Sequence, residues 1–349
     1  MIIFVYFNNR YNKVGKAPLL LSPVRKTARN QILEQINSKI IEVEETGCPQ
    51  CQSCNKECIS EVDNFGIPIS VSVCLDCGLV YTSRKITDAS LNDIYSSTLY
   101  GQIDRGSPEP PSSYFERGVF KGANIFAHIS AFKKPLVNQT VLDVGCGTGG
   151  VLSYFKKQGC LETGLDLGYE NIQYGRNQHD LNLFCGDIDH LDDVLEVSKR
   201  FDFIILEQTL EHLSNPIGML KTLQKRLNPN GLLYIGVPGL RNIREQYDGD
   251  LLRYIQFPHL VHFTLSSLSS ILNCAGFKII WGNESISAIA QISPTSTRQI
   301  KNESQSILDL VTELKSEFWS IRRIAKRLFF TYPIWFLGYI KALYTGISQ

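Results

Sequence analysis

The sequence predicts an α/β fold: a doubly wound, Rossmann-like sheet with a small cysteine-rich unit ahead of it and a helical tail behind it. Two observations predict the sheet. An apolar run ends in a glycine-rich loop within 141–150, and strand-like and helix-like segments alternate from there to about residue 281. A third observation, six cysteines between Cys48 and Cys77, predicts the separate unit. The chain has 349 residues, of which 43% are hydrophobic, enough for two domains or for one domain with appendages.

The charge, the cysteine content and the distribution of apolar residues limit the classes of protein to which this chain can belong. The net charge of +1 favours neither nucleic acid nor a strongly acidic partner. Clustered cysteines favour a metal site over disulfides, and the sequence has no apolar stretch long enough to span a membrane. We therefore expect a cytoplasmic protein.

Two Cys-x-x-Cys pairs, Cys51/Cys54 and Cys74/Cys77, have the spacing of a structural zinc ribbon. The residue after the second cysteine of such a pair often adopts a left-handed backbone conformation. Gly78, after Cys77, fits that requirement, and asparagine, which follows Cys54, tolerates it. The predicted zinc ligands are therefore Cys51, Cys54, Cys74 and Cys77.

Two further cysteines keep alternatives open. Cys48 and Cys58 are not used as ligands in this assignment. If Cys51 were the second cysteine of the first pair, Gln52 would occupy the left-handed position, which glutamine fits less well than asparagine. Pro49 is common within such pairs, so Cys48/Cys51 stays open as the first pair. The alternative to a metal site is a group of free buried thiols. A closed set of four thiolates would make the zinc structural and not catalytic.

The glycine-rich loop follows the apolar run Val141–Val144 and precedes a helical pattern that starts at Val151. Glycine permits a positive φ and the close approach of a ligand, and the N-terminus of the helix offers N–H groups to an anion. Gly145, Gly147 and Gly150 also satisfy the dinucleotide pattern GxGxxG, so the loop by itself leaves NAD open as a cofactor.

Two acidic residues favour a different nucleoside cofactor. Asp143 lies two residues before the first glycine, where a carboxylate would repel a pyrophosphate but suits a ligand with ammonium and sulfonium groups. Asp166 ends the next expected strand, about twenty residues after the glycines, where an acidic side chain meets the ribose hydroxyls in folds of this kind. Both positions favour S-adenosylmethionine.

Segment 141–150 resembles the first motif of class I S-adenosylmethionine-dependent methyltransferases, and the likeness continues to about residue 280. Glu211-His212-Leu213 followed by Asn215-Pro216 matches the LEHL…P pattern of many members. The resemblance implies the seven-stranded sheet of that family. It also implies that Asp187 contacts the adenine amino group and that Ile188 packs on the ring, although Asp187 is also a common turn residue. The implied cofactor-binding residues are Asp143, Gly145, Cys146, Gly147, Gly149, Asp166, Leu167, Asp187, Ile188 and Glu207.

The remaining core elements follow in α/β order. The apolar run 201–206 predicts a fully buried strand, and ligands of doubly wound sheets bind at the carboxyl ends of such strands. Asparagine, proline and glycine at 228–231 end the helix that precedes the next strand. We expect helices at 114–132, 217–227 and 265–275, and strands at 163–166, 183–188, 201–206, 232–237 and 277–281.

Methyl transfer to a hydroxyl or an enolisable carbon requires a base, and histidine has a suitable pKa. His212 follows the strand that ends near Leu206, and His259 lies on a loop that can reach the same edge of the sheet. We predict His212 or His259 as the base, although each is equally well explained as a hydrogen-bonded structural histidine. A structural role is favoured for His262.

The cysteine-rich unit ahead of the core resembles that of C-methyltransferases acting on nucleotide-linked deoxyketo sugars. Those proteins carry a large second α/β domain, whereas only about seventy residues follow the core here. The fuller likeness is to methyltransferases of surface-polysaccharide biosynthesis. We therefore expect a nucleotide- or lipid-linked sugar as the acceptor. A quinone-like lipid or another natural product, an RNA-binding zinc-ribbon protein and an NAD-dependent oxidoreductase are the alternatives.

The tail contains a basic helix whose apolar side is formed by Ile321, Ile324, Ala325 and Leu328. This helix would rest on a membrane surface, on a partner or on the core.

On this interpretation the chain divides into five parts. The parts are an N-terminal extension (1–45), a zinc-ribbon-like unit (46–83), a linker or lid (84–112), the methyltransferase core (113–285) and a helical basic and aromatic tail (286–349).

Overall fold

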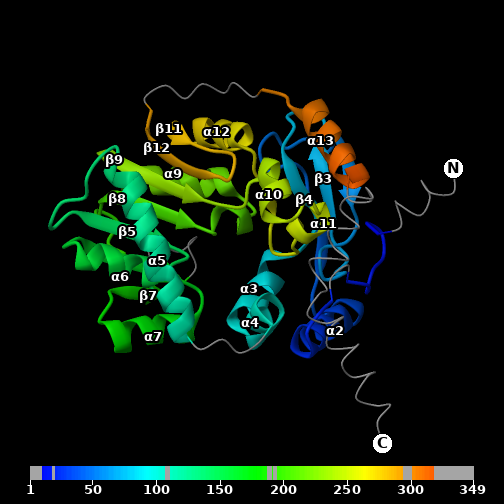
Figure 1. Ribbon diagram of the computed structural model, residues 1–349, viewed down its shortest axis with the longest axis horizontal. Coiled ribbons are helices and arrows are strands. Elements are labelled where there is room, and N and C mark those ends of the chain that lie inside the picture. Colours follow the sequence, from blue (N-terminus) through cyan, green and yellow to red (C-terminus); the bar gives the residue numbers. More distant parts are fainter. Residues whose placement is uncertain are drawn as a thin grey trace, which may run out of the picture.

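The protein contains two sheets that lie side by side and are joined by connecting segments and a common core (Figure 1). The coordinates are a computed structural model. They describe residues 10–17, 20–106, 111–186, 191, 195–293 and 301–317. None of the helices in these ranges is long and apolar enough to cross a membrane. The tail helix expected at 321–328 and the cofactor residues Asp187 and Ile188 lie outside the described residues.

The larger sheet has seven strands in the order β11-β12-β9-β8-β5-β6-β7, which confirms the predicted fold class. Parallel pairing joins β7, β6, β5, β8 and β9, whereas β12 runs antiparallel to both of its neighbours. The strands are β5 (Thr140–Val144), β6 (Leu161–Asp166), β7 (Leu183–Cys185), β8 (Phe201–Glu207), β9 (Leu227–Gly236), β11 (Phe277–Gly282) and β12 (Ser287–Ile292).

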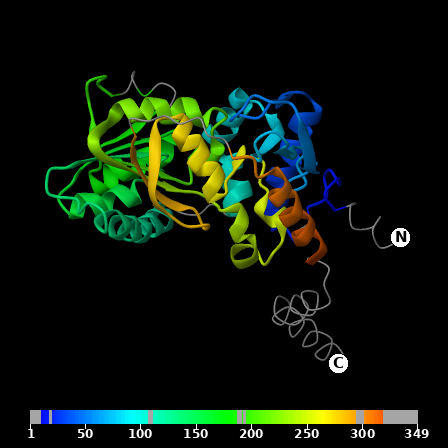
Figure 2. The ribbon, with the colours of Figure 1, turned by 90° about the horizontal axis from the view of Figure 1, so that it is seen from above.

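Helices cover both faces of this sheet, with α5 on one side and α9 and α12 on the other (Figure 2). Two of these helices, α9 and α12, begin with a side-chain cap. Pro216 occupies the first turn of α9, and the Asn215 side chain accepts a hydrogen bond from the Gly218 N–H at 2.9 Å. Thr264 caps α12 in a capping box with Ser267. The helices are α5 (Pro111–Ser130), α6 (Gly150–Lys157), α7 (Tyr169–His179), α9 (Pro216–Arg226) and α12 (Leu265–Cys274).

Two glycines allow α5 to pack directly on the start of α6. A Cβ atom on Gly150 would lie 2.8 Å from the Gly118 Cα, and a Cβ on Gly118 would lie 2.9 Å from the Gly150 Cα. Both distances are shorter than real Cβ contacts, and the obstructing atoms belong to the backbone. This packing therefore fixes α5 beside the glycine-rich loop.

The substitution Gly150→Ala is expected to destabilise the protein by about 1–3 kcal/mol, because the added methyl group overpacks a backbone contact. Urea unfolding of the variant and the parent measures the difference. Phe120→Ala on α5 is the control, since this side chain is 71% exposed. A Gly150→Ala variant as stable as the control would show that α5 and α6 can separate without cost.

The smaller sheet is antiparallel and combines distant parts of the chain. Its order is β1-β4-β3-β2, and β10 pairs with the free edge of β4 near its start. Because β10 follows β9 in sequence, the cysteine-rich unit is completed by a strand from the methyltransferase half. The strands are β1 (Val43–Glu45), β2 (Lys56–Ser60), β3 (Ser70–Cys74), β4 (Val80–Ile86) and β10 (Val261–His262).

Residues 84–112, predicted as a linker or lid, are largely helical where the structure describes them. Helix α3 (Asp88–Ser96) is capped by Thr87, and α4 (Thr98–Arg105) ends at Gly106 in the left-handed conformation. The polar residues that suggested a linker are caps and exposed positions, whereas Leu91, Ile94 and Ile103 are buried. The helices lie between the two halves of the molecule (Figure 1).

The predicted boundary at residue 285 falls before the last strand of the larger sheet. Ala288, Ile289 and Ala290 are all buried in β12, so this strand lacks the alternation that marks a half-buried strand in sequence. Helix α13 (Ser304–Glu317) then returns to lie beside β3 (Figure 1). In the N-terminal extension, α2 (Pro23–Asn37) packs against α4.

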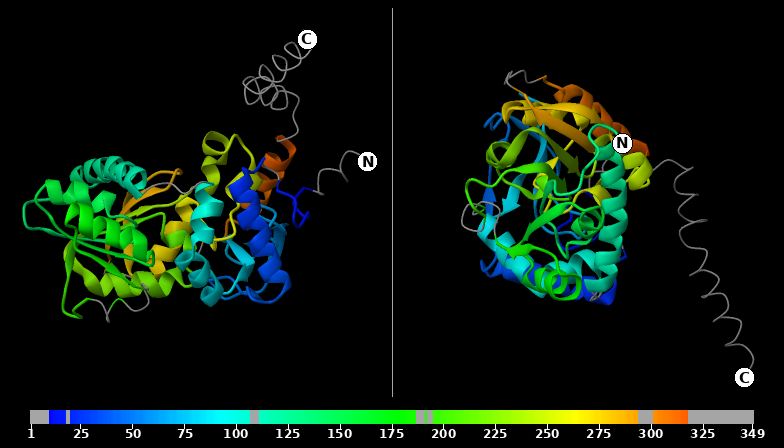
Figure 3. Two further views of the ribbon diagram at one scale, coloured as in Figure 1. Left: turned by 90° about the horizontal axis from the view of Figure 1, so that it is seen from below. Right: turned by 90° about the vertical axis from the view of Figure 1, so that its left-hand side faces the viewer.

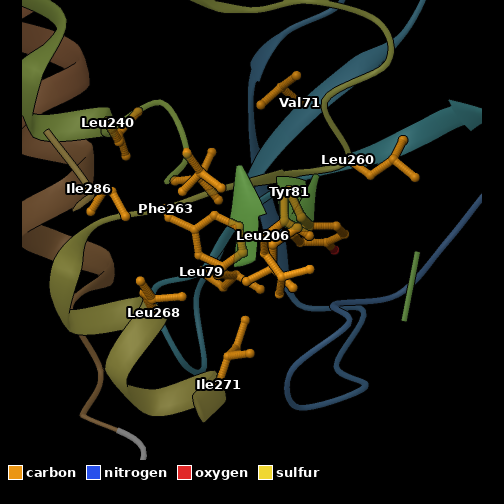
Figure 4. Packing of buried hydrophobic residues seen from close by; sticks show 14 of the residues in the cluster. Val71, Leu79, Tyr81, Leu206, Leu240, Leu260, Phe263, Leu268, Ile271 and Ile286 are labelled. Carbon is orange, nitrogen blue, oxygen red and sulfur yellow. The ribbon is translucent and has the colours of Figure 1, made fainter. Parts of the chain in front are cut away.

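One hydrophobic cluster joins the two sheets (Figure 4). It brings together Tyr81 of β4, Leu206 of β8 and Phe263 next to β10, and none of the three is more than 1% exposed. Short helices α10 (Ile243–Gln246) and α11 (Leu251–Tyr254) fill the space between the halves. Asp63 ties the segments together because its carboxylate accepts a hydrogen bond from Phe257 N–H at 3.1 Å. The molecule is elongated, with the two sheets at opposite ends (Figure 3).

Candidate active site

Three acidic side chains lie at the carboxyl ends of three adjacent strands. Asp143 is in β5, Asp166 ends β6 and Glu207 ends β8, and β5 pairs with both of the others. Since parallel strands end at the same edge of a sheet, the structure places these predicted cofactor residues along one edge. The charges on Glu207 and Asp166 both act on Asp143.

The glycine-rich loop follows β5 and is held by Asp166. Gly145 and Gly147 have φ values of 79° and 54°, in the left-handed region that glycine adopts without strain. The Asp166 carboxylate accepts hydrogen bonds from Gly147 N–H at 2.8 Å and from Gly168 N–H at 2.7 Å. This carboxylate therefore orders the loop and still has lone pairs for further donors.

Asp143 is the most unusual of the three acidic residues. It is 2% exposed, and its Oδ1 atom makes no hydrogen bond within the described part of the chain. Burial, followed by the charges of Glu207 and Asp166, raises the pKa of Asp143 well above its usual value. A buried acceptor without a donor is costly. A positively charged or N–H-donating ligand at this edge would relieve that cost.

The other predicted cofactor residues surround the same loop. Gly149 caps α6 with a φ of 78°. Cys146 is buried, and burial raises the pKa of its thiol well above the usual value. Leu167 is half-buried, and its carbonyl lies 3.6 Å from the Cys185 sulfur.

A cavity of about 550 Å³ opens next to the carboxyl ends of β8 and β9. Lys121 from α5 lines this cavity, and its Nζ donates a hydrogen bond to Glu207 Oε1 at 2.8 Å. Most of the side chains that line it are polar, among them Asn124, His128, Gln208, Tyr234, Gln246 and Ser287. Sequence reasoning identified none of these six, because they come from helices and strand ends without a local motif.

The two histidines predicted as bases lie together. Their ring centroids are 4.9 Å apart, and Nδ1 of His212 lies 3.0 Å from the Pro258 carbonyl and 2.8 Å from the Tyr95 hydroxyl. Burial lowers the pKa of His212 to about 4 and the pKa of His259 well below its usual value. His262 lies in β10 with its ring 6.5 Å from that of His259.

Sequence reasoning did not assign a role to Glu211, which joins these histidines. It is 1% exposed, and one carboxylate oxygen lies 3.8 Å from His212 Nε2. Possible ligand atoms of Glu211, His212 and His259 all lie within 4.8 Å of one another. The match to the LEHL…P pattern contained the glutamate, but its position in the cluster depends on the fold of the 258–262 segment.

Cys48, not Cys54, joins Cys51, Cys74 and Cys77 in the cysteine cluster. Cys54 is exposed and lies outside the group, as does Cys58. The physical reason is the backbone at Gln52, which adopts the left-handed conformation with φ 65°. Gln52 therefore adopts, after Cys51, the same left-handed conformation that Gly78 adopts after Cys77 with φ 81°.

The spacing of the four sulfurs suits a tetrahedral ion. The Cys48 and Cys77 sulfurs are 3.5 Å apart, as are those of Cys51 and Cys74, and all four lie within 4.8 Å of one another. Zinc–sulfur bonds of about 2.3 Å in a tetrahedron place sulfurs roughly 3.8 Å apart. The hydrogen bond from Cys77 lowers the pKa of Cys48 to about 6, whereas burial raises that of Cys74 to about 12.

Comparison with known proteins agrees with this geometry. A family profile described as a methyltransferase domain matches residues 122–280. The ubiquinone biosynthesis O-methyltransferase of Coxiella burnetii is 34% identical over 104 residues, which cover 28% of this chain and 43% of that protein. The homologous enzyme of Histophilus somni is 25% identical over 182 residues, covering 44% of this chain and 76% of that protein.

Among solved structures, an amino pentose methyltransferase from Micromonospora echinaspora aligns with a TM-score of 0.41 and 16% identity, covering 56% of this chain and 97% of that one. The chain spans less than half the length of the Coxiella burnetii relative that it matches. The profile match begins within α5 and ends in β11, so it includes the glycine-rich loop and the three acidic strand ends. Residues 122–280 are therefore similar in sequence to a methyltransferase domain.

Proposed function

We propose that the chain transfers a methyl group from S-adenosylmethionine to a sugar, either nucleotide- or lipid-linked. The unpartnered, buried Oδ1 atom of Asp143 carries the proposal, because an acidic pocket at this edge suits a cationic donor. Asp166 would hold the ribose hydroxyls through the lone pairs that its two backbone donors leave unused. The glycine-rich loop, Cys146, Leu167 and Glu207 would complete the donor site.

The bound donor supplies an electrophilic methyl group and a neutral thioether leaving group. The chain's contribution is to orient an acceptor and exclude water, so most of the gain in rate is positional. The cavity beside Glu207 is the place for the acceptor, because it borders the acidic edge and is open to the outside. The assignment of His212 or His259 as the base stays a prediction.

The polar lining of this cavity favours a hydroxyl-rich acceptor. Asn124, Gln246 and Ser287 offer hydrogen bonds from three different elements. Tyr234 and Tyr247 provide ring surfaces, on which the apolar face of a sugar or a quinone-like ring would pack. The relatives from Coxiella burnetii and Histophilus somni favour a quinone-like acceptor as the second candidate.

We also propose that the cysteine cluster binds a structural zinc ion through Cys48, Cys51, Cys74 and Cys77. The four sulfurs fit the tetrahedral spacing, and the set is closed. The ion would hold the 48–52 turn against the β3–β4 turn. It would thereby support the sheet against which β10 and the His259 loop pack.

Labelled methyl transfer tests the proposed reaction. The purified chain is incubated with radiolabelled S-adenosylmethionine and, in separate reactions, with nucleotide-linked sugars, lipid-linked glycans and a hydroxylated quinol. Label is expected in a sugar fraction. Label in the quinol alone would make the second candidate correct. Transfer to none of these acceptors by protein that binds the donor would contradict the proposed acceptor classes.

A further inference from the structure

We infer that Glu211, His212 and His259 form a second metal site, chemically distinct from the cysteine cluster. One carboxylate and two imidazoles are typical ligands of a divalent transition metal such as zinc, iron or cobalt. Their possible ligand atoms lie within 4.8 Å of one another. The inference goes beyond methyl transfer, because the site can be occupied whether or not the donor binds.

The carboxylate of Glu211 is the strongest indication. Glu211 is 1% exposed, and neither of its oxygens makes a hydrogen bond within the described part of the chain. Both acceptors therefore lack the donors that buried oxygens normally have. The neighbouring His212 Nε2 lies 3.8 Å from Oε1, too far for a hydrogen bond but a suitable separation for two ligands of one ion.

The surrounding hydrogen bonds orient His212 as a ligand. Its Nδ1 lies 3.0 Å from the Pro258 carbonyl, which can only accept, so the proton belongs on Nδ1. That tautomer presents the lone pair of Nε2 to Glu211. Metal-binding histidines commonly donate their other N–H to a carbonyl in this way. The Tyr95 hydroxyl oxygen lies 2.8 Å from the same Nδ1 and accepts from the same N–H, which also fixes the orientation of the ring.

Backbone contacts hold the other two ligands in place. Leu260 N–H donates to the Glu211 carbonyl at 2.7 Å, which ties the turn after β8 to the 258–262 segment. The Thr82 hydroxyl donates to the His259 carbonyl at 2.7 Å. His259 is 6% exposed. The three ligands thus come from the methyltransferase half, and Thr82 of the smaller sheet adds one of the supporting contacts that a preorganised site requires.

Three protein ligands leave at least one coordination position open, which is typical of catalytic metal sites. The site lies beyond the end of β8, whose last residue, Glu207, also lines the acceptor cavity. On this inference His212 and His259 act as ligands and not as free bases. An ion here would polarise an oxygen of the acceptor that reaches the open position.

Metal content and cobalt spectroscopy of the full chain test the inference. The purified protein, stripped of metal and then dialysed against Co²⁺, is expected to bind two equivalents. One should show the intense sulfur-to-cobalt charge transfer of the cysteine cluster, and the other only the weaker bands of nitrogen and oxygen ligation. Glu211→Gln and His259→Ala should each lose the second equivalent and retain the sulfur-derived bands.

His262→Ala is the matched control, because this histidine is also buried and lies three positions after His259 but outside the ligand group. It should bind both equivalents. Spectra of the unmodified chain keep the test decisive if a variant fails to fold. Binding of a single, sulfur-ligated cobalt by the unmodified protein would overturn the inference, whether or not the protein binds S-adenosylmethionine.

Discussion

Replacing Cys48 with serine is expected to remove zinc from the cysteine cluster and to unfold the smaller sheet. The Cys48 sulfur lies 3.5 Å from that of Cys77, so it forms one corner of the four-sulfur group. Structural zinc contributes about 10–16 kcal/mol of apparent folding free energy in zinc-finger peptides. Even part of this contribution rivals the total stability of an ordinary domain, which is about 5–15 kcal/mol.

Cys54→Ser provides the matched control, because Cys54 is six residues away in sequence, exposed and outside the cluster. Thermal unfolding and zinc content should change in Cys48→Ser and stay unchanged in Cys54→Ser. The comparison also decides between the two sets of four cysteines. A zinc-free Cys54→Ser protein and a zinc-bound Cys48→Ser protein would show that the first pair is Cys51/Cys54, as the sequence alone suggested.

Replacing Asp166 with alanine is expected to weaken the binding of S-adenosylmethionine and S-adenosylhomocysteine by roughly tenfold to hundredfold. Hydrogen bonds to a charged group contribute about 1.5–3 kcal/mol each, and about 1.4 kcal/mol corresponds to a factor of ten in affinity. The variant also loses the acceptor of Gly147 N–H and Gly168 N–H, so the glycine-rich loop should become less ordered. Titration calorimetry measures the affinity.

Two further variants separate direct binding from loop order. Asp166→Asn keeps a side-chain oxygen for one backbone N–H but loses the negative charge, so its affinity should fall between those of the parent and Asp166→Ala. Asp180→Ala removes an exposed carboxylate at the C-terminal end of α7, where it lies 3.3 Å from Lys156 Nζ, and its affinity should match the parent. Unchanged affinity in Asp166→Ala would refute the ribose-binding role.

The larger sheet could be predicted because its signals are local. A glycine-rich turn, a buried strand at 201–206 and a helix capped by Asn215 each depend on adjacent residues. Strand β12 was missed because its buried Ala288 and Ala290 give no alternating pattern. The boundary of the core was consequently placed too early.

The features that sequence reasoning missed depend on distant contacts. Strand β10 pairs with β4 but comes far later in the sequence, after most strands of the larger sheet. No local sequence pattern therefore indicates that β10 lies beside the cysteine-rich unit. Glu211 and His259 are far apart in sequence and meet because Leu260 N–H bonds the Glu211 carbonyl. The exchange of Cys48 for Cys54 has a different origin: Gln52 adopts a conformation that is uncommon for its residue type.

The central claim is that the acidic edge formed by Asp143, Asp166 and Glu207 binds a cationic methyl donor. Titration calorimetry of the unmodified protein with S-adenosylmethionine, S-adenosylhomocysteine and NAD tests it most directly. We predict one binding site for each of the first two ligands and no binding of NAD, whose pyrophosphate would meet the Asp143 carboxylate. Binding of NAD alone, or of none of the three ligands, would contradict the claim.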